Sequence, residues 1–467
     1  MLLVILVLIA YSILHRKMSY FIILMITFLI GFTCYSLYIN NRTYKVPNMY
    51  SSSCVGTVVS IKTYDNSLSL LLEDVKIDGQ KQDYNVTVYY YNVYQEGYIK
   101  LNVGSKISFN IERQSEVDKF TEDGLPHTYN YKNNIGAEFV TYNVTLLEEN
   151  TKIRTGLLAQ IRENLRLGFS NFNGEMIYSA MFGDKAELNS DLYDAYKSAG
   201  VAHLLAVSGL HVGLVVAILN WIMKRCKIKG WWRVAITGVL LVGYAYLCGF
   251  SYSIIRASIM AMVLLIAPIM FSEYDLLSSI CFAGSLILLI DPIALFDVSA
   301  LLSFGCVIGI AMLYPIFKQC FIKVPITDKV KDGFSISLAT IISTFAIMAY
   351  FFRYVQPVGL ISNIIIIPIF SILFTLSFIV VMLSLLLPFV SYSLILLNPL
   401  FETLNWFIIF IANNTKSIPI YNINFLSILI FFALITFVSK FNLKKGVTKI
   451  NMVLVCLCVL ALQVALV

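Results

Sequence analysis

The stretch AGVAHLLAVSGLHVGLV, residues 199–215, decides how this chain folds. It opens an apolar run that is long enough to span a bilayer, yet it holds two of the chain's four histidines, a serine and three glycines. Polar and ionisable groups inside a membrane are costly, so the stretch needs protein or water around it rather than lipid. Residue types alone leave two interpretations open: a helix whose glycines allow close packing, or a segment that lines a pathway.

The composition of the whole chain is that of a membrane protein. Its 467 residues are 58% hydrophobic and 13% charged, with a mean hydropathy of +0.79, whereas soluble proteins are about a quarter charged. Recurring apolar runs predict a mainly α-helical, polytopic membrane protein with about 12 transmembrane helices. The runs are 1–14, 19–39, 201–223, 234–250, 254–271, 276–290, 298–317, 334–354, 358–387, 390–412, 425–438 and 450–467.

Basic loops orient these spans. The loop at 15–17 reads His-Arg-Lys, and Lys and Arg in short loops mark the cytoplasmic side. Alternation of the spans then places three later basic loops, at 224–233, 318–331 and 440–449, on the same side. We therefore expect both termini, and the polar segment that follows the second span, to lie outside.

Residues 45–150 form a separate, acidic domain with nine Lys and Arg against fourteen Asp and Glu. Runs rich in Val, Ile, Thr and Tyr, with a hairpin signal at Asp78-Gly79, predict five strands and one long connection at 113–136. We expect an extracellular small β-barrel of OB-like type, with a sandwich fragment as the alternative. The predicted strands are 54–61, 67–77, 83–91, 104–112 and 137–147.

The β domain holds eleven tyrosines. Exposed aromatic rings would suit the stacking of single-stranded nucleic acid, but tyrosine is also an ordinary strand residue. Because the domain's net charge is negative, a general phosphate-binding surface is disfavoured, and we prefer the second interpretation.

The other domain boundaries follow from changes in pattern. Residues 1–44 hold two N-terminal transmembrane helices, 151–200 amphipathic or interfacial helices, and 201–467 the main transmembrane domain. Within 152–172 apolar residues recur at three- and four-residue steps, which predicts a helix lying on the membrane face. The polar stretch after it contains Asp184.

Motifs of soluble enzymes are missing from the sequence. It has no G-x-x-x-x-G-K-[ST] motif for ATP hydrolysis and no H-E-x-x-H cluster, so we expect neither a cofactor nor a metal. Ser208 and His211 stand three residues apart and could share one face of a helix. An intramembrane hydrolase with a serine nucleophile is therefore a minor alternative.

Further polar residues punctuate the apolar half. Arg256 lies early in the run SYSIIRASIMAMVLLI, where a guanidinium could meet a phosphate or a carboxylate. Arg353 and Asn363 stand near predicted span ends, where an interfacial anchor is the plainer interpretation. Pro357 and Pro368 are expected to break a very long helix, which is tolerated at membrane depth where the chain lines a cavity.

The segment AGVAHLLAVSGLHVGLVVA closely resembles the signature of the ComEC-type competence proteins, the channels that bring single-stranded DNA across the bacterial cytoplasmic membrane. Four shorter segments match in the same order, and the two N-terminal spans with an outer OB-like domain also fit that family. The shorter segments are FGDKAELNSDL at 182–192, YSIIRASIM at 252–260, DPIALFDVSALLSF at 291–304 and FFRYVQPVGLISNIIIIPI at 351–369.

This resemblance implies a transmembrane channel for single-stranded DNA in natural transformation, not an enzyme, in the bacterial cytoplasmic membrane. A transporter of another anionic substrate is the alternative. The implied partners are single-stranded DNA, membrane lipid, a DNA receptor and a cytoplasmic ATPase, with a separate hydrolase chain left open as one alternative. The channel or pathway residues would be His203, Ser208, Gly209, His211, Gly213, Arg256, Asp184, Arg353 and Asn363.

The sequence departs from the family pattern in two places. Family members tend to have Gly-Phe-Gln where Ser299, Ala300 and Leu301 stand here. Many members also carry a C-terminal β-lactamase-like hydrolase domain, which has no counterpart in these 467 residues.

Overall fold

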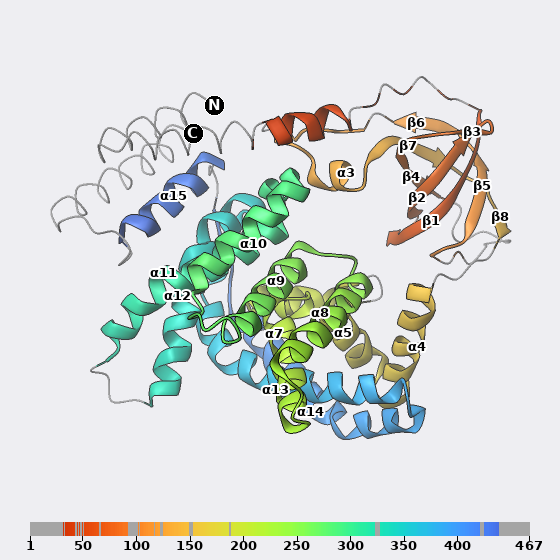
Figure 1. Ribbon diagram of the computed structural model, residues 1–467. Helices are drawn as coiled ribbons and strands as arrows, with labels where there is room; N and C mark the ends of the chain where they lie inside the picture. The colour runs from red at the N-terminus through yellow and green to blue at the C-terminus, as the bar shows by residue number, and fades with distance from the viewer. Residues whose placement is uncertain are drawn as a thin grey trace, which may run out of the picture. The chain divides into compact units, whose positions relative to one another are not determined.

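The computed structural model divides the chain into two units, one formed by Met1–Thr155 with Ser285–Asp297 and the other by Gly156–Gly284 with Val298–Val467 (Figure 1). It describes residue 31 and residues 33–438, apart from 43, 45, 47–48, 50, 65–66, 92–100, 102, 116, 122–124, 149–152, 186–187, 323–326 and 421–424. The predicted spans at 1–14 and 450–467, most of the span at 19–39 and the basic loop at 440–449 lie outside the described residues.

The first unit is built around one sheet with the strand order β6-β7-β4-β2-β1-β5-β8, and β3 pairs with β2. All pairs are antiparallel except β4 with β7, which is parallel. The strands are β1 Ser53–Tyr64, β2 Ser67–Ile77, β3 Gln80–Lys81, β4 Asn85–Tyr90, β5 Lys106–Asn110, β6 Arg113–Ser115, β7 Ile135–Thr141 and β8 Val144–Glu148.

Local chemistry explains the sheet. Asp78 and Gly79 both have positive φ, 47° and 82°, which is the conformation that a tight two-residue hairpin demands, so the predicted turn is confirmed. Alternate residues such as Leu70, Leu72 and Val86 are fully buried and form the core of the unit.

Two predicted features of this unit differ in the structure. The predicted strand 137–147 is two strands, because the chain turns at 142–143, where the Thr141 hydroxyl donates to the Asn143 carbonyl at 3.0 Å. The long connection at 113–136 is not plain loop: it contains β6 and the short helix α3, Thr128–Lys132.

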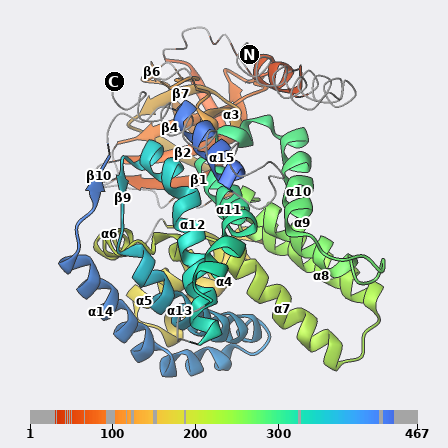
Figure 2. The ribbon, with the colours of Figure 1, turned by 90° about the vertical axis from the view of Figure 1, so that its left-hand side faces the viewer.

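The second unit is helical (Figures 1 and 2). Its core gathers buried residues from α4 to α9, α13, η3 and α14. The elements are α4 Ile153–Gly168, α5 Asn171–Phe182, α6 Ser190–Ser198, η1 Ala202–Leu205, α7 Gly209–Arg225, α8 Gly230–Leu247, α9 Tyr252–Ile266, α10 Leu276–Ile290, α11 Val298–Cys320, α12 Asp328–Phe352, α13 Gly359–Ser384, η3 Pro388–Leu396, α14 Asn398–Asn414 and α15 Phe425–Val438, with β9 Tyr354–Val355 paired to β10 Ile418–Pro419. The first residues of α4 and the last of α10 belong to the first unit.

Several of these helices have the length and composition of membrane spans. Within the described residues α11, α12 and α13 qualify, and η3 with α14, bent by 47°, would make a fourth. Helices α9, α10 and α15 are shorter but apolar. The apolar helices agree with the membrane character predicted from composition, and three or four candidates fall short of the twelve spans that the runs predict.

The helices correct two predictions about breaks. Pro368 lies inside α13, which continues through it to Ser384, because a proline removes one backbone hydrogen bond without ending a long helix in apolar surroundings. The apolar run 201–223 is not one helix, since η1 ends at Leu205 and α7 begins only at Gly209.

Helix α4 packs on protein along its apolar side. Ile161 and Leu165 are fully buried, and the Asn164 amide donates to the Ser384 hydroxyl of α13 at 2.9 Å. Gly168 lies so close to η3 that an added Cβ would stand 2.4 Å from the Ser391 carbonyl oxygen. This side of the predicted amphipathic helix therefore meets α13 and η3.

Candidate substrate pathway at residues 199–215

The segment opens with a close backbone crossing. Gly200, just after α6, has φ 76°, and a Cβ there would stand 2.7 Å from the Cα of Gly359, the first residue of α13. Only glycine combines a left-handed backbone with such an approach at little cost. This crossing fixes residues 199–201 against the start of α13.

The short helix η1 is anchored on one side and open on the other. Leu204 and Leu205 are fully buried, and the Ser179 hydroxyl of α5 donates to the Leu205 carbonyl at 2.8 Å. His203, which directly precedes these two leucines, is exposed. The four-residue element therefore presents an imidazole on its accessible side.

The start of α7 is organised by its own histidine. Ser208 is the N-cap, and its backbone N–H donates to Nδ1 of His211 at 3.4 Å. The His211 side chain is fully buried and stacks on Phe374 of α13 with ring centroids 4.2 Å apart. Because Nδ1 accepts from the backbone of Ser208, this ring acts as a cap on the helix and not as a base placed on the Ser208 hydroxyl.

Arg256 of α9 lies beside the same helix start. Its side chain is 4% exposed, Nη1 donates to the Ser303 carbonyl at 2.8 Å, and the guanidinium stands 5.9 Å from the Phe304 ring. A Cβ on Gly209 would be 2.6 Å from Nη2 of Arg256. In the part of the chain that the structure describes, no carboxylate pairs with this guanidinium.

This arrangement concentrates positive charge. A guanidinium has five N–H donors, and in Arg256 one serves Ser303 while Nε has no hydrogen-bond partner. The N-terminus of α7 next to it carries the positive end of a helix dipole. A buried cation without a carboxylate is costly, so its presence points to an anionic ligand.

The other predicted pathway residues have surroundings of their own among the described residues. Gly213 of α7 has open space where a Cβ would stand. Arg353 is the exposed C-cap of α12, with φ 61° and its guanidinium 5.6 Å from the Tyr350 ring. Asn363 is half-buried on α13, and its Oδ1 has no hydrogen-bond partner.

Asp184 belongs to an ion cluster that ties α4 to α5. Its Oδ2 lies 3.4 Å from Nη2 of Arg162, while Arg162 and Arg166 contact the nearly buried Glu175 at 3.3 and 3.2 Å. The structure thus groups Ser208, Gly209, His211 and Arg256, and gives Asp184 a different setting.

A buried amide network was not predicted. Asn405 of α14 donates to Asn173 of α5 at 2.8 Å and accepts from the Tyr196 hydroxyl of α6 at 2.7 Å, while Asn173 donates to Asn398 at 2.8 Å. The available signal was an asparagine inside the apolar run that becomes α14. The network holds α5, α6 and α14 together.

The described residues contain no group of three or more His, Cys, Asp or Glu side chains placed to hold a metal ion.

The chain is similar to known competence proteins. Residues 180–444 match the Competence protein family model. ComE operon protein 3 of Bacillus subtilis (strain 168) is 26% identical over 196 residues, which are 42% of this chain and 24% of that protein. Recombination protein 2 of Haemophilus influenzae is 26% identical over 211 residues, 42% of this chain and 27% of that protein.

A third relative, Competence protein ComA of Neisseria gonorrhoeae, is 30% identical over 139 residues, 27% of this chain and 19% of that protein. The matched stretches therefore span about a quarter or less of these relatives. No solved structure matches. The family model spans more than half of the 467 residues and includes the whole segment 199–215 with Arg256, so the chain belongs to the Competence protein family, as a protein of the ComEC type.

Proposed function

We propose that this protein is a channel through which single-stranded DNA crosses the bacterial cytoplasmic membrane during transformation. Membership of the Competence protein family supports a role in DNA uptake. The observation that best supports a channel is the setting of Arg256. Its guanidinium is buried beside the start of α7 and has no carboxylate partner among the described residues.

The physical reason lies in the charge of the substrate. Each phosphate of a single strand brings one negative charge into a region that excludes bulk water, so a pathway needs fixed positive groups and dipoles. Arg256 and the N-terminus of α7 supply both within one small volume. His203 in η1, just before α7, and Asn363 in α13 would add polar lining.

The architecture we infer has about 12 transmembrane helices, with both termini and the β domain outside. We also infer that the sheet of the first unit is an OB-like barrel. Supporting this, β7 pairs with β4 and β8 pairs with β5, and only residues 142–143 separate β7 from β8. The two strands thus connect β4 back to β5, which also pairs with β1.

We further propose that the chain is not an enzyme and works with a DNA receptor and a cytoplasmic ATPase. The contact between Ser208 N–H and His211 Nδ1 supports a non-catalytic role for this pair. If Ser208→Ala keeps uptake while Arg256→Gln loses it, the serine-nucleophile alternative is contradicted.

The experiment compares cells carrying the native protein, Arg256→Gln or Arg256→Lys at matched expression. In Arg256→Gln cells, labelled DNA should still bind the surface but should no longer reach a nuclease-protected internal pool. Arg256→Lys should recover uptake in part, because Lys restores the charge but not the planar set of guanidinium donors. The control is Lys331→Gln, since Lys331 pairs with exposed Asp328 at the α11–α12 tip. Normal transformation in cells that lack the protein would contradict the proposal.

A transporter of a small anion is the second candidate, because one guanidinium beside one helix start suits a single oxyanion as well as a strand. Proteoliposomes separate the two. Flux of inorganic phosphate that ignores an added oligonucleotide would favour the transporter.

A further inference from the structure

The hairpin of α7 and α8 ends in a tip, residues 220–233, of unusual composition. Three of the chain's four tryptophans are here, and Trp221, Trp231 and Trp232 are 60%, 58% and 65% exposed. The tip also carries five basic side chains, and the sequence has no Asp or Glu anywhere from 195 to 272. The basic residues are Lys224, Arg225, Lys227, Lys229 and Arg233.

Few contacts within the tip neutralise or cover these groups. The Arg225 guanidinium stands 5.5 Å from the Trp221 ring, and Arg233 donates to the Asn220 amide oxygen at 3.1 Å. Lys229 is the N-cap of α8 without a side-chain cap bond, and the first turn of α8 has no acidic residue. The tip therefore keeps its positive charge.

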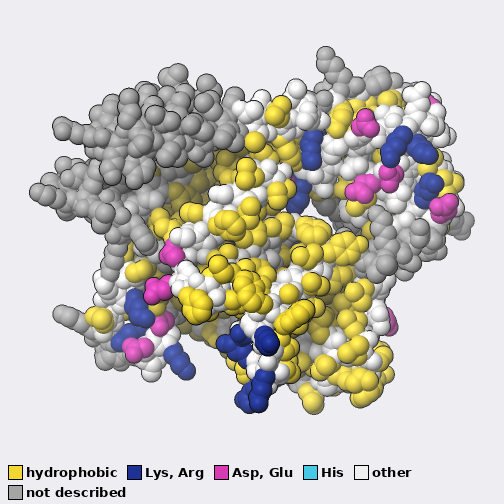
Figure 3. Space-filling model, viewed as in Figure 1, with side chains coloured by type: hydrophobic (Ala, Val, Ile, Leu, Met, Phe, Trp, Pro, Cys, Tyr) yellow, Lys and Arg dark blue, Asp and Glu magenta, His cyan; other side chains and the backbone are white. Residues whose placement is uncertain are grey.

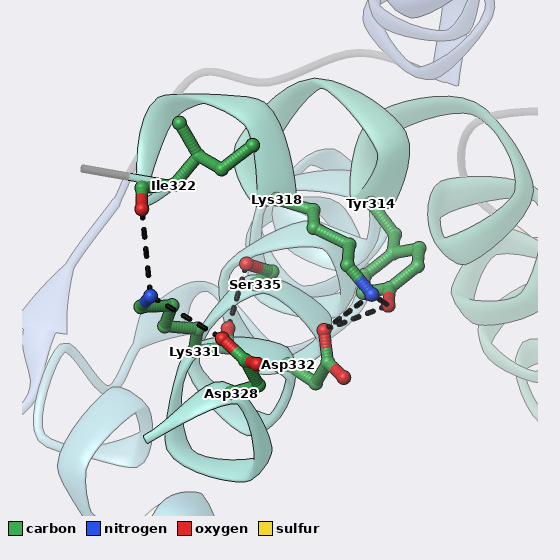
Figure 4. Close-up of polar contacts among 7 residues, drawn as sticks. All are labelled: Tyr314, Lys318, Ile322, Asp328, Lys331, Asp332 and Ser335. Atoms are coloured by element: carbon green, nitrogen blue, oxygen red, sulfur yellow. Dashed lines mark hydrogen bonds and ion pairs between the residues drawn. The ribbon is translucent and has the colours of Figure 1, made fainter. Parts of the chain in front are cut away.

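The tip of α11 and α12 differs, although the basic-loop rule treats both alike. There Lys318 pairs with Asp332 at 3.0 Å and Lys331 with Asp328 at 3.3 Å, and Tyr314 donates to Asp332 (Figure 4). Figure 3 shows Lys and Arg mixed with Asp and Glu at the α11–α12 tip and unmixed at the α7–α8 tip. Topology explains basic loops, but not one that lacks acids and carries three exposed indoles.

Side chains along the start of α8 change from basic to aromatic to aliphatic, which is the order of the headgroup, interface and acyl-chain layers of a membrane. Basic Lys229 comes first, Trp231 and Trp232 follow, and then Val239 and Val242, which are 74% and 64% exposed. Indole rings favour the zone between headgroups and acyl chains, and clustered Lys and Arg favour anionic headgroups. A nucleic-acid site would need the basic side chains and indoles but not the adjoining aliphatic surface.

We propose that the α7–α8 tip is a docking site for the headgroups of anionic phospholipids. The basic side chains bind the headgroups, the three indoles lie at the headgroup level, and the aliphatic face of α8 contacts the acyl chains. This assignment does not rest on the proposed passage of DNA.

The tryptophans provide the readout. The Trp406→Phe variant of the full chain has indoles only at the tip. It is reconstituted in bilayers of phosphatidylcholine and phosphatidylglycerol. Bromine, which quenches tryptophan emission, is placed on the acyl chains of one lipid or of the other. Brominated phosphatidylglycerol should quench the emission more strongly at equal mole fraction. The preference should fall by up to about fivefold for each charge removed in Lys227→Gln and Lys229→Gln, and with added salt.

The matched control neutralises Lys318 and Lys331 at the ion-paired tip and should leave the preference unchanged. Equal quenching by both lipids in the protein with its basic residues intact would overturn the proposal without any variant. So would a preference that survives loss of the charges, or one that free inorganic phosphate abolishes. Absence of quenching by either lipid, with emission that responds to a single-stranded oligonucleotide, would assign the tip to nucleic acid instead.

Discussion

Replacement of Gly200 by alanine tests the crossing that positions the 199–215 segment. A left-handed backbone, here φ 76°, costs an alanine about 1–2 kcal/mol. The new Cβ would also stand 2.7 Å from the Cα of Gly359, and backbone cannot swing aside as a side-chain end can. Overpacking of this kind costs about 1–3 kcal/mol, so we expect Gly200→Ala to destabilise the helical unit by about 2–5 kcal/mol.

Two glycines in contact with or near the crossing serve as controls. A Cβ on Gly359 would meet Gly200 only at 3.6 Å, an ordinary contact, so Gly359→Ala should be nearly neutral. Gly213 lies inside α7 with nothing within 4 Å, and alanine there should stabilise by about 0.5–1 kcal/mol.

The assay is unfolding of the purified protein by SDS in mixed micelles, followed by circular dichroism, together with uptake of labelled DNA by cells. If Gly200→Ala unfolds within about 0.5 kcal/mol of Gly359→Ala, the spread of an ordinary surface change, the crossing does not constrain the segment and the reasoning is wrong.

Three further predictions concern polar groups that are buried or half-buried. Asn405→Ala removes the donor to the Asn173 Oδ1 and the amide acceptor of the Tyr196 hydroxyl, and should cost about 1–3 kcal/mol in the same assay. Asn414→Ala, at an exposed site, should not. Lys119→Met should destabilise the β domain, measured by hydrogen exchange of the sheet, because Nζ donates to the carbonyls of Arg42 and Ile135; unchanged exchange would contradict this. Burial raises the pKa of Glu138 above its usual 4.5, and the charge of Asp118 raises it further, so ionisation of Glu138 opposes folding. Glu138→Gln should therefore stabilise the sheet at neutral pH. This advantage should shrink as the pH falls through the raised pKa, because the native carboxyl is then protonated. A gain that grows on acidification would refute it.

Sequence patterns were sufficient where chemistry is local. The positive φ values at Asp78 and Gly79 follow from residue type, as does the cap that Asp291 gives to the helix η2, Pro292–Phe296, where its Oδ1 accepts from Ile293 N–H at 3.3 Å. The sequence also singled out 199–215 and Arg256 as candidate site residues, because polar groups in an apolar run need partners.

The rest depends on contacts between distant segments. Periodicity could not reveal that the run 201–223 breaks before Gly209, because the break is set by crossings with α13 and α9. Nor could it pair Asn173 with Asn405, which lie 232 positions apart. The spacing of Ser208 and His211 suggested a shared face, but which atoms meet depends on backbone geometry at the helix start.

Helix α13 sets the distance that the segment 199–215 has to cover. It meets the segment twice, at Gly359 opposite Gly200 and at Phe374 beneath His211. Fifteen helical residues rise roughly 22 Å, whereas the eleven steps from Gly200 to His211 would rise only about 16 Å as α-helix. Extended residues such as Ala206 and Ser208 make up that difference. The non-helical residues before α7 therefore let this short segment contact α13 at both Gly359 and Phe374. A residue added or removed there would shift His211 and Gly209 together relative to Arg256.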